Sequence, residues 1–100
     1  MNAVLPGGLH SYKRTPSFTQ NTVPAGLLGK HATKAGVWGL IHVEEGALRY
    51  IVSDERRQPS QAVLTPTTGP GVVEPTIVHR VEPLGKVRFH VAFLRTAGAD

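Results

Sequence analysis

The sequence predicts an all-β domain built from short strands. Valine-rich runs alternate apolar and polar residues with period two, and no stretch shows a helical period. Eleven glycines and eight prolines punctuate the chain at close spacing. One hundred residues suit one domain with a modest core. Short strands of this kind, seven or eight in number, are typical of a sandwich, a barrel or a jelly roll.

The elements follow from this alternation, beginning at the N-terminus. A loose arm is expected over residues 1–11, and a frayed tail over residues 96–100. Pro16 keeps the first segment at a sheet edge, because proline cannot donate to a ladder. The strand segments expected between these ends are Ser11–Phe18, Leu27–Thr33, Val37–Val43, Ala47–Val52, Gln61–Leu64, Thr76–Glu82 and Lys86–Arg95.

Glycine and proline mark the predicted turns. The sequence Glu44-Glu45-Gly46 is the clearest hairpin signal, since it is a short turn with glycine where a positive φ is needed. Pro83–Gly85 is expected to turn the chain into the last strand. Ser53–Ser60 is expected to be a solvated loop, with the charges of Asp54–Arg57 at the surface.

Composition narrows the function classes. The net charge of +4 is mild for a nucleic-acid binder, and the basic residues are scattered without a basic run. The absence of cysteine excludes disulfides, a cysteine-based zinc site and a cysteine nucleophile. No apolar run is long enough to span a bilayer, and no secretory signal is evident. We therefore expect a soluble, cytoplasmic protein that binds neither nucleic acid nor membrane.

The first candidate site residue is a histidine in line with apolar residues. Period two places Ile77, His79 and Val81 on one strand face. Such a histidine is either a satisfied core residue or a ligand that points into a pocket, and on its own the core interpretation is favoured. His42 and Glu44 also share a strand face, but no third group is expected to converge there, and His90 is expected at the surface.

Two segments resemble the signature motifs of the cupin family. The first motif corresponds to Gly26, His31, Thr33, Trp38 and Gly46, and the second to Gly69, Pro75 and His79. The sequence departs from the cupin pattern in having Thr33 at the second histidine position and Trp38 or Gly39 at the glutamate position. In addition, Pro75 is one residue closer to His79 than is usual.

A narrower resemblance covers nearly the whole chain, from about Tyr12 to Arg95. The segments Lys30–Gly39, Gly46–Tyr50 and Val73–Glu82 are similar to a small cupin family that comprises the N-terminal domain of TehB-type tellurite-resistance proteins and stand-alone YeaR-like proteins. The resemblance implies a double-stranded β-helix, a cupin-like jelly-roll barrel, over residues 12–95. It also links the family to tellurite resistance and to oxidative or nitrosative stress.

The cupin resemblance implies a site at the mouth of the barrel. His31 and His79 are expected to converge there and to hold a divalent metal such as Zn, Ni or Fe. Glu74 is the expected third metal ligand, with Glu82 or water as the alternatives. Further ligand contacts are expected from Lys34, Trp38, Arg80 and Glu82, although Glu82 lies on the opposite strand face from His79.

These residues lead to a functional expectation with two alternatives. The expectation is a small binding domain that holds a divalent metal, an oxyanion or a small ligand, without chemistry. One alternative is a metal-dependent oxygenase or isomerase that uses the same histidines. The other is a non-catalytic dimerisation or accessory domain. Exposed strand edges favour a homodimer.

Overall fold

The computed structural model describes residues 5–96 as one six-stranded antiparallel sheet with a single helical turn. The bounds are β1 Leu9–Arg14, β2 Phe18–Thr19, α1 Ala25–Leu28, β3 Trp38–Val52, β4 Ser60–Leu64, β5 Gly71–Val73 and β6 His79–Thr96. The all-β prediction is confirmed. Of the predicted termini, residues 1–4 and 97–100 lie outside the described residues, and β1 begins inside the predicted arm.

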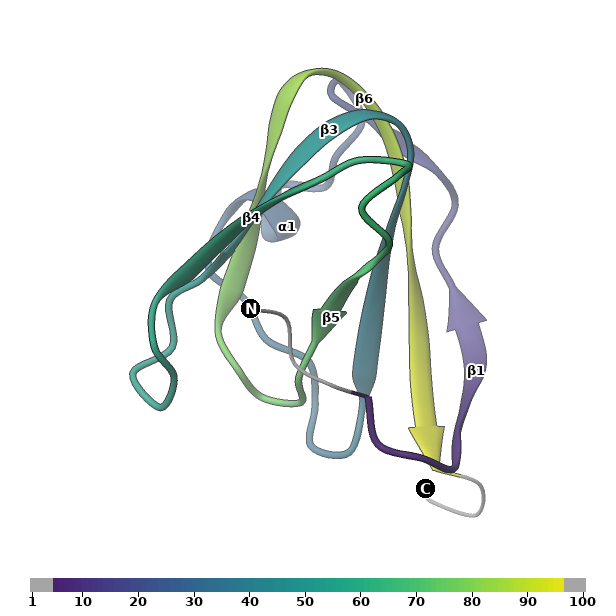
Figure 1. The fold of residues 1–100 in the computed structure, drawn as a ribbon, viewed down its shortest axis with the longest axis vertical. Coiled ribbons are helices and arrows are strands. Elements are labelled where there is room, and N and C mark those ends of the chain that lie inside the picture. Colours follow the sequence, from purple (N-terminus) through teal and green to yellow (C-terminus); the bar gives the residue numbers. More distant parts are fainter. Residues whose placement is uncertain (1–4, 97–100) are drawn as a thin grey trace.

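Two long strands form the centre of the fold. β3 and β6 pair antiparallel from Trp38 opposite Leu94 to Val52 opposite His79. β1 and β2 add to β6, while β4 and β5 add to β3. Figure 1 shows both long strands bending over together near the top of the view. Each long strand therefore contributes to both halves of the bent sheet.

The bend lies where the sequence predicted turns. The predictions of a hairpin at Glu44–Gly46 and of a turn at Pro83–Gly85 are wrong, because β3 and β6 continue through these residues as single strands. The register instead shifts between Val43 and Glu45 and between Gly46 and Leu48, as at β-bulges. Gly46 has a φ of 79°, and a Cβ there would meet the carbonyl of Lys86. The glycine signal was real, but it marks a bulge in a continuous strand.

The predicted strand Leu27–Thr33 is also absent. Pro24 precedes a single helical turn, closed by a hydrogen bond from the Leu27 N–H to the Pro24 carbonyl. Gly29 then returns the chain to an extended conformation. From this stretch, His31 alone pairs with the sheet, as an isolated bridge to His79.

The core fills the concave side of the bent sheet. Inward residues alternate with outward ones along β3 and β6, as period two predicts. The two largest side chains that solvent does not reach are Phe89 and Leu48. The buried core cluster comprises Ile41, Val43, Leu48, Tyr50, Leu64, Val73, Val81, Val87, Phe89 and Val91.

Candidate functional site

A cavity of about 570 Å³ opens beside this core. Its walls are mainly apolar, and it is bounded by β1, β2, the α1 turn and the inner faces of β3 and β6. Polar groups in the wall include His31 and His79, with Lys13 and Lys34 as its charged residues. The apolar wall includes Phe18, Leu27, Val37, Ile41, Val73, Val81, Phe89, Val91 and Phe93.

The structure brings His31 and His79 together. The two backbones exchange a pair of hydrogen bonds of 3.0 and 2.9 Å, and the ring centroids lie 4.1 Å apart. Each Nδ1 lies 2.9 Å from a backbone carbonyl oxygen, that of Gly29 for His31 and that of Ile77 for His79. A carbonyl oxygen only accepts, so each Nδ1 carries the hydrogen and each Nε2 is left as an acceptor in the neutral ring.

His79 is the more deeply placed of the pair, with 3% of its surface exposed. Burial and the neighbouring His31 lower the pKa of His79 below 6.5, although the hydrogen bond to the Ile77 carbonyl opposes this. Tyr50 packs its ring 5.7 Å from His79 and donates its hydroxyl to the Val72 carbonyl. Burial raises the pKa of Tyr50, so its hydroxyl stays protonated.

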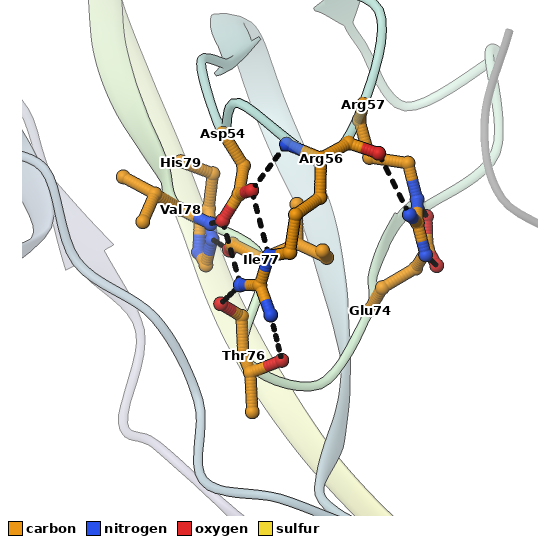
Figure 2. Close-up of polar contacts among 8 residues, drawn as sticks. All are labelled: Asp54, Arg56, Arg57, Glu74, Thr76, Ile77, Val78 and His79. Carbon is orange, nitrogen blue, oxygen red and sulfur yellow. Dashed lines mark hydrogen bonds and ion pairs between the residues drawn. The ribbon is translucent and has the colours of Figure 1, made fainter.

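A buried carboxylate fixes the backbone that leads into His79. Asp54, which is 7% exposed, accepts the Val78 N–H at 2.9 Å and two side-chain hydrogen bonds from Arg56 at 2.9 and 2.8 Å. Arg56 in turn donates to the Thr76 carbonyl, where Thr76 has a φ of 66° (Figure 2). Hydrogen bonds from Arg56 and Val78 hold the pKa of Asp54 well below its usual range. The expectation that this charge cluster lies at the surface is wrong for Asp54.

Glu74 does not join the histidines through any hydrogen bond that the structure records. Its carboxylate forms an ion pair with Arg57 at 2.8 Å, on the other side of the loop from the Asp54 network (Figure 2). The hydrogen bond from Arg57 lowers the pKa of Glu74. Across the part of the chain that the structure describes, no group of three or more His, Asp or Glu side chains is arranged to hold a metal ion.

The remaining predicted contacts divide between the cavity and the outside. Lys34 lines the cavity, while Trp38 and Arg80 alternate with inward residues on their strands and are absent from the cavity wall. Glu82 lies on the outer face in ion pairs with Arg80 and Arg49, each at 3.3 Å. The prediction that Trp38, Arg80 and Glu82 contact a ligand therefore finds no support in their placement.

Sequence reasoning missed two contributors to this site, Tyr50 and Asp54. Tyr50 looked like an ordinary inward strand residue, and nothing in its spacing indicated contact with His79. Asp54 gave a detectable signal, because an Asp two residues before an Arg is a common local hydrogen-bonded pair. Phe18, at the end of the predicted first segment, packs edge-on against Phe89 with ring centroids 5.7 Å apart.

The arrangement offers limited chemistry. His31 and His79 line a mainly apolar cavity, and in the Nδ1–H tautomer each Nε2 can accept a hydrogen bond or a proton. No cysteine is available as a nucleophile. Thr33 lines the cavity, but its hydroxyl donates to the Val37 carbonyl.

The antiparallel sheet makes this protein a small β domain, and a match to a family model identifies its family. Residues 13–91 match the model of the TehB-like domain, so the chain belongs to the TehB-like domain family. The narrower resemblance to TehB is confirmed at this level.

Two relatives of known name share this domain. The chain is 35% identical over 74 residues to the "Probable S-adenosyl-L-methionine-dependent methyltransferase TehB" of Haemophilus influenzae strain Rd. It is 34% identical over 74 residues to the protein of the same name from strain 10810. Both matches cover 73% of this chain but only 26% of the relative.

Two solved structures share the fold. The crystal structure of TehB from H. influenzae superposes with a TM-score of 0.82 at 30% identity, over 90% of this chain and 32% of that one. A crystal structure of a protein from E. coli strain K12 superposes with a TM-score of 0.81 at 23% identity, over 94% of this chain and 97% of that one. The second likeness concerns the fold alone.

These comparisons correct the functional prediction. The relatives are named as probable methyltransferases, so the expected binding domain for a divalent metal, an oxyanion or a small ligand is wrong, and so is the metal-dependent oxygenase or isomerase. The homodimer stays a prediction. Within residues 5–96 no helix is long and apolar enough to cross a membrane.

Proposed function

We propose that this chain acts as a companion domain of a TehB-type methyltransferase and that methyl transfer takes place in a different module. The observation that carries the proposal is the partial match to the named relatives, since the chain corresponds to only 26% of their length. A segment of that size leaves most of the relative to provide a catalytic domain.

The cavity does not fit S-adenosyl-L-methionine. This cofactor carries a sulfonium and an ammonium group, which are best stabilised by a negative charge nearby, and one carboxylate, which a lysine could pair with. The charged residues of the cavity wall are Lys13 and Lys34, which are cations, and no Asp or Glu lines it. A sulfonium placed there would face like charge across mainly apolar walls.

The sheet topology supports the same conclusion. In open α/β sheets, nucleotide cofactors bind at the carboxyl ends of parallel strands, often against a helix N-terminus. Every strand pairing among residues 5–96 is antiparallel, and α1 has only four residues. We derive no step of methyl transfer through this domain.

We also propose that the domain is a cupin-like double-stranded β-helix of the kind found in stand-alone YeaR-like proteins. The pairing of His31 with His79 supports this, because the two motif segments of a cupin lie side by side. A likeness that covers 97% of the E. coli protein supports the idea that this fold exists without a further domain.

A chimera with the Haemophilus influenzae relative tests the companion role. Three forms would be compared: the intact relative, a form without the matching segment, and a form in which this chain replaces that segment. We expect deletion to lower kcat/KM for methyl transfer and the chimera to recover most of it. This chain alone should show no binding of S-adenosyl-L-methionine in isothermal titration.

Two results would contradict the proposal. One is micromolar binding of the cofactor, or methyl transfer, by this chain alone. The other is a deletion form that folds and retains the full kcat/KM, because the domain would then contribute nothing to the enzyme. A chimera with Gly46→Ala is the control for folding of the inserted domain, because it carries the same surface residues on a domain that is expected to be less stable.

A further inference from the structure

A polar cluster lies on the outer face of the sheet, away from the histidines of the cavity. His42 on β3 faces His90 on β6, and the two rings stack with centroids 4.9 Å apart and planes at 22°. The Nδ1 of His90 lies 2.6 Å from an oxygen of Glu44, and the Ser17 hydroxyl donates to the same oxygen at 2.6 Å. We call these four residues the outer-face cluster. The expectation that nothing converges on His42 and Glu44 is therefore wrong.

Ser17 belongs to a segment that forms part of the cavity wall. We call Thr15–Thr19 the strap. The Thr15 N–H donates to the Val91 carbonyl at 2.9 Å, and the Thr15 hydroxyl accepts the Val91 N–H at 3.0 Å. Thr15 and Phe18 both line the cavity, so displacement of the strap would open the cavity from this side.

Titratable and charged groups from β1 and β6 act on the cluster. Arg14 on β1 and His90 on β6 act on His42, while Arg88 on β6 acts on Glu44. Burial, His90 and Arg14 lower the pKa of His42 below 6.5, and Glu44 opposes them weakly. Hydrogen bonds from Ser17 and His90 lower the pKa of Glu44. At neutral pH the cluster therefore holds an uncharged His42 beside an ionised Glu44.

We propose that the outer-face cluster is a proton-operated latch, in which proton uptake by His42 releases the strap and opens the wall of the cavity. The inference is independent of the companion role, because it concerns how the cavity is closed rather than what the domain serves.

The release follows from the geometry of the stack. A proton on His42 places a positive charge 4.9 Å from a ring whose Nδ1–H is committed to Glu44, and close to Arg14. Glu44 lies on the same strand as His42 and its carboxylate attracts this charge, whereas Ser17 belongs to a segment that pairs with β6 only through Thr15 and the two-residue strand β2. The protonated His42 therefore competes with Ser17 and His90 for the Glu44 carboxylate, and loss of the Ser17 hydrogen bond loosens the strap. Protonation of Glu44 in stronger acid removes its negative charge and so weakens both hydrogen bonds that it accepts.

Amide hydrogen exchange tests the latch. The reporters are the Thr15 and Val91 amides, whose bonds hold the strap. The reference is the Ser53 amide, which donates to the Val78 carbonyl just beyond the ends of β3 and β6. Between pH 7.5 and pH 5.0 we expect the protection factors of the two reporters to fall about fivefold relative to Ser53, after correction for intrinsic exchange. The nuclear Overhauser contact between the Phe18 and Phe89 rings should weaken in parallel.

Two variants separate the latch from general loosening in acid. His42→Phe keeps a ring on His90 but takes up no proton, so the strap should stay protected at pH 5.0. Ser17→Ala removes the tie to Glu44, so the strap should be poorly protected already at pH 7.5. Equal relative protection of the wild-type strap at both pH values would overturn the proposal, as would an undiminished pH response in His42→Phe.

The wild-type protein provides a check that needs no variant. The midpoint of strap opening should coincide with the titration midpoint of His42, followed through its ring proton shifts. A midpoint that instead follows His79 or His10 would also overturn the proposal.

Discussion

Two backbone carbonyl groups determine the tautomer of the cavity histidines. Because the carbonyl oxygens of Gly29 and Ile77 accept from Nδ1, the neutral form of His31 and His79 should be the Nδ1–H tautomer. We expect ¹⁵N chemical shifts at pH 7.5 to show a protonated Nδ1 and an unprotonated Nε2 for both rings. His42, for which the structure records no hydrogen bond at either ring nitrogen, is the comparison. A protonated Nε2 on His79 would contradict the assignment.

Gly46 is the residue on which the bend of β3 depends most directly. Its φ of 79° lies in the left-handed region, and an added Cβ would meet the backbone of Lys86 and Val87 rather than a side chain that could move away. We expect Gly46→Ala to lower the free energy of unfolding by about 3 kcal/mol or more, since left-handed strain and a backbone clash add together. Urea denaturation measures this difference.

Gly85→Ala is the matched control for Gly46→Ala. Gly85 has the same φ of 79°, but no atom lies within 4 Å of a Cβ built there. The control should therefore cost about 1 kcal/mol, from the backbone conformation alone. Equal losses in the two variants would show that the contact with Lys86 carries no weight.

At the scale of elements, a loop clamps the segment that delivers His79. The Ser53–Arg57 turn reaches across to Thr76 and Val78 through Asp54 and Arg56 (Figure 2). Asp54→Asn would keep the side-chain shape but replace one acceptor oxygen with a donor, which must then face the Val78 N–H or the Arg56 guanidinium. We expect the melting temperature to fall by several degrees and the Val78 amide to lose its protection.

Glu74→Gln tests the same loop at its other ion pair. Arg57 and Glu74 are more exposed than Asp54, with 47% and 24% of their side chains accessible. Exposed ion pairs contribute little, so this variant should leave the melting temperature nearly unchanged. If Glu74→Gln destabilised the protein as much as Asp54→Asn, the clamp would not depend on the buried carboxylate.

The elements also show what the sequence can and cannot predict. The period-two alternation predicted for the valine-rich strands is confirmed in β6, where Val87, Phe89 and Val91 are buried and the residues between them are more exposed. The apparent turn at Gly46 was misleading, because glycine at positive φ serves a bulge as well as a hairpin. Contacts between residues far apart in the sequence could not be predicted in this way.

The candidate site was predictable only in part, for the same reason. The convergence of His31 and His79 followed from the motif resemblance, and the structure brings them together. The ion pair of Glu74 with Arg57 spans 17 residues, and the hydrogen bond from Tyr50 to Val72 spans 22. A local sequence pattern reveals neither contact, so the hydrogen-bond partners of Glu74 and Tyr50 could not be predicted from the sequence.

For the whole molecule, the pKa shifts of two buried or half-buried histidines and of three carboxylates act in the same direction. Burial is the main cause of the lowered pKa of both His79 and His42, each below its ordinary value of 6.5. Hydrogen bonds are the main cause of the lowered pKa of Asp54, Glu44 and Glu74. In each case the folded protein holds its protons less tightly than the unfolded chain does.

The free energy of unfolding should therefore decrease in two stages as the pH falls. Below pH 6.5 the unfolded chain protonates its histidines before the folded protein does, so stability is lost from that pH down to the folded pKa values of His79 and His42. Below the ordinary pKa values of 4.5 for Glu44 and Glu74 and 3.8 for Asp54, the unfolded chain again binds protons before the folded protein does. A second loss of stability therefore begins there. Thermal melts from pH 8 to pH 3 should be level above about pH 7.5 and should show both declines. His42→Phe should reduce the first decline, and Asp54→Asn should reduce the second. A wild-type melting temperature that stays level from pH 7 to pH 5 would refute the role assigned to His79 and His42.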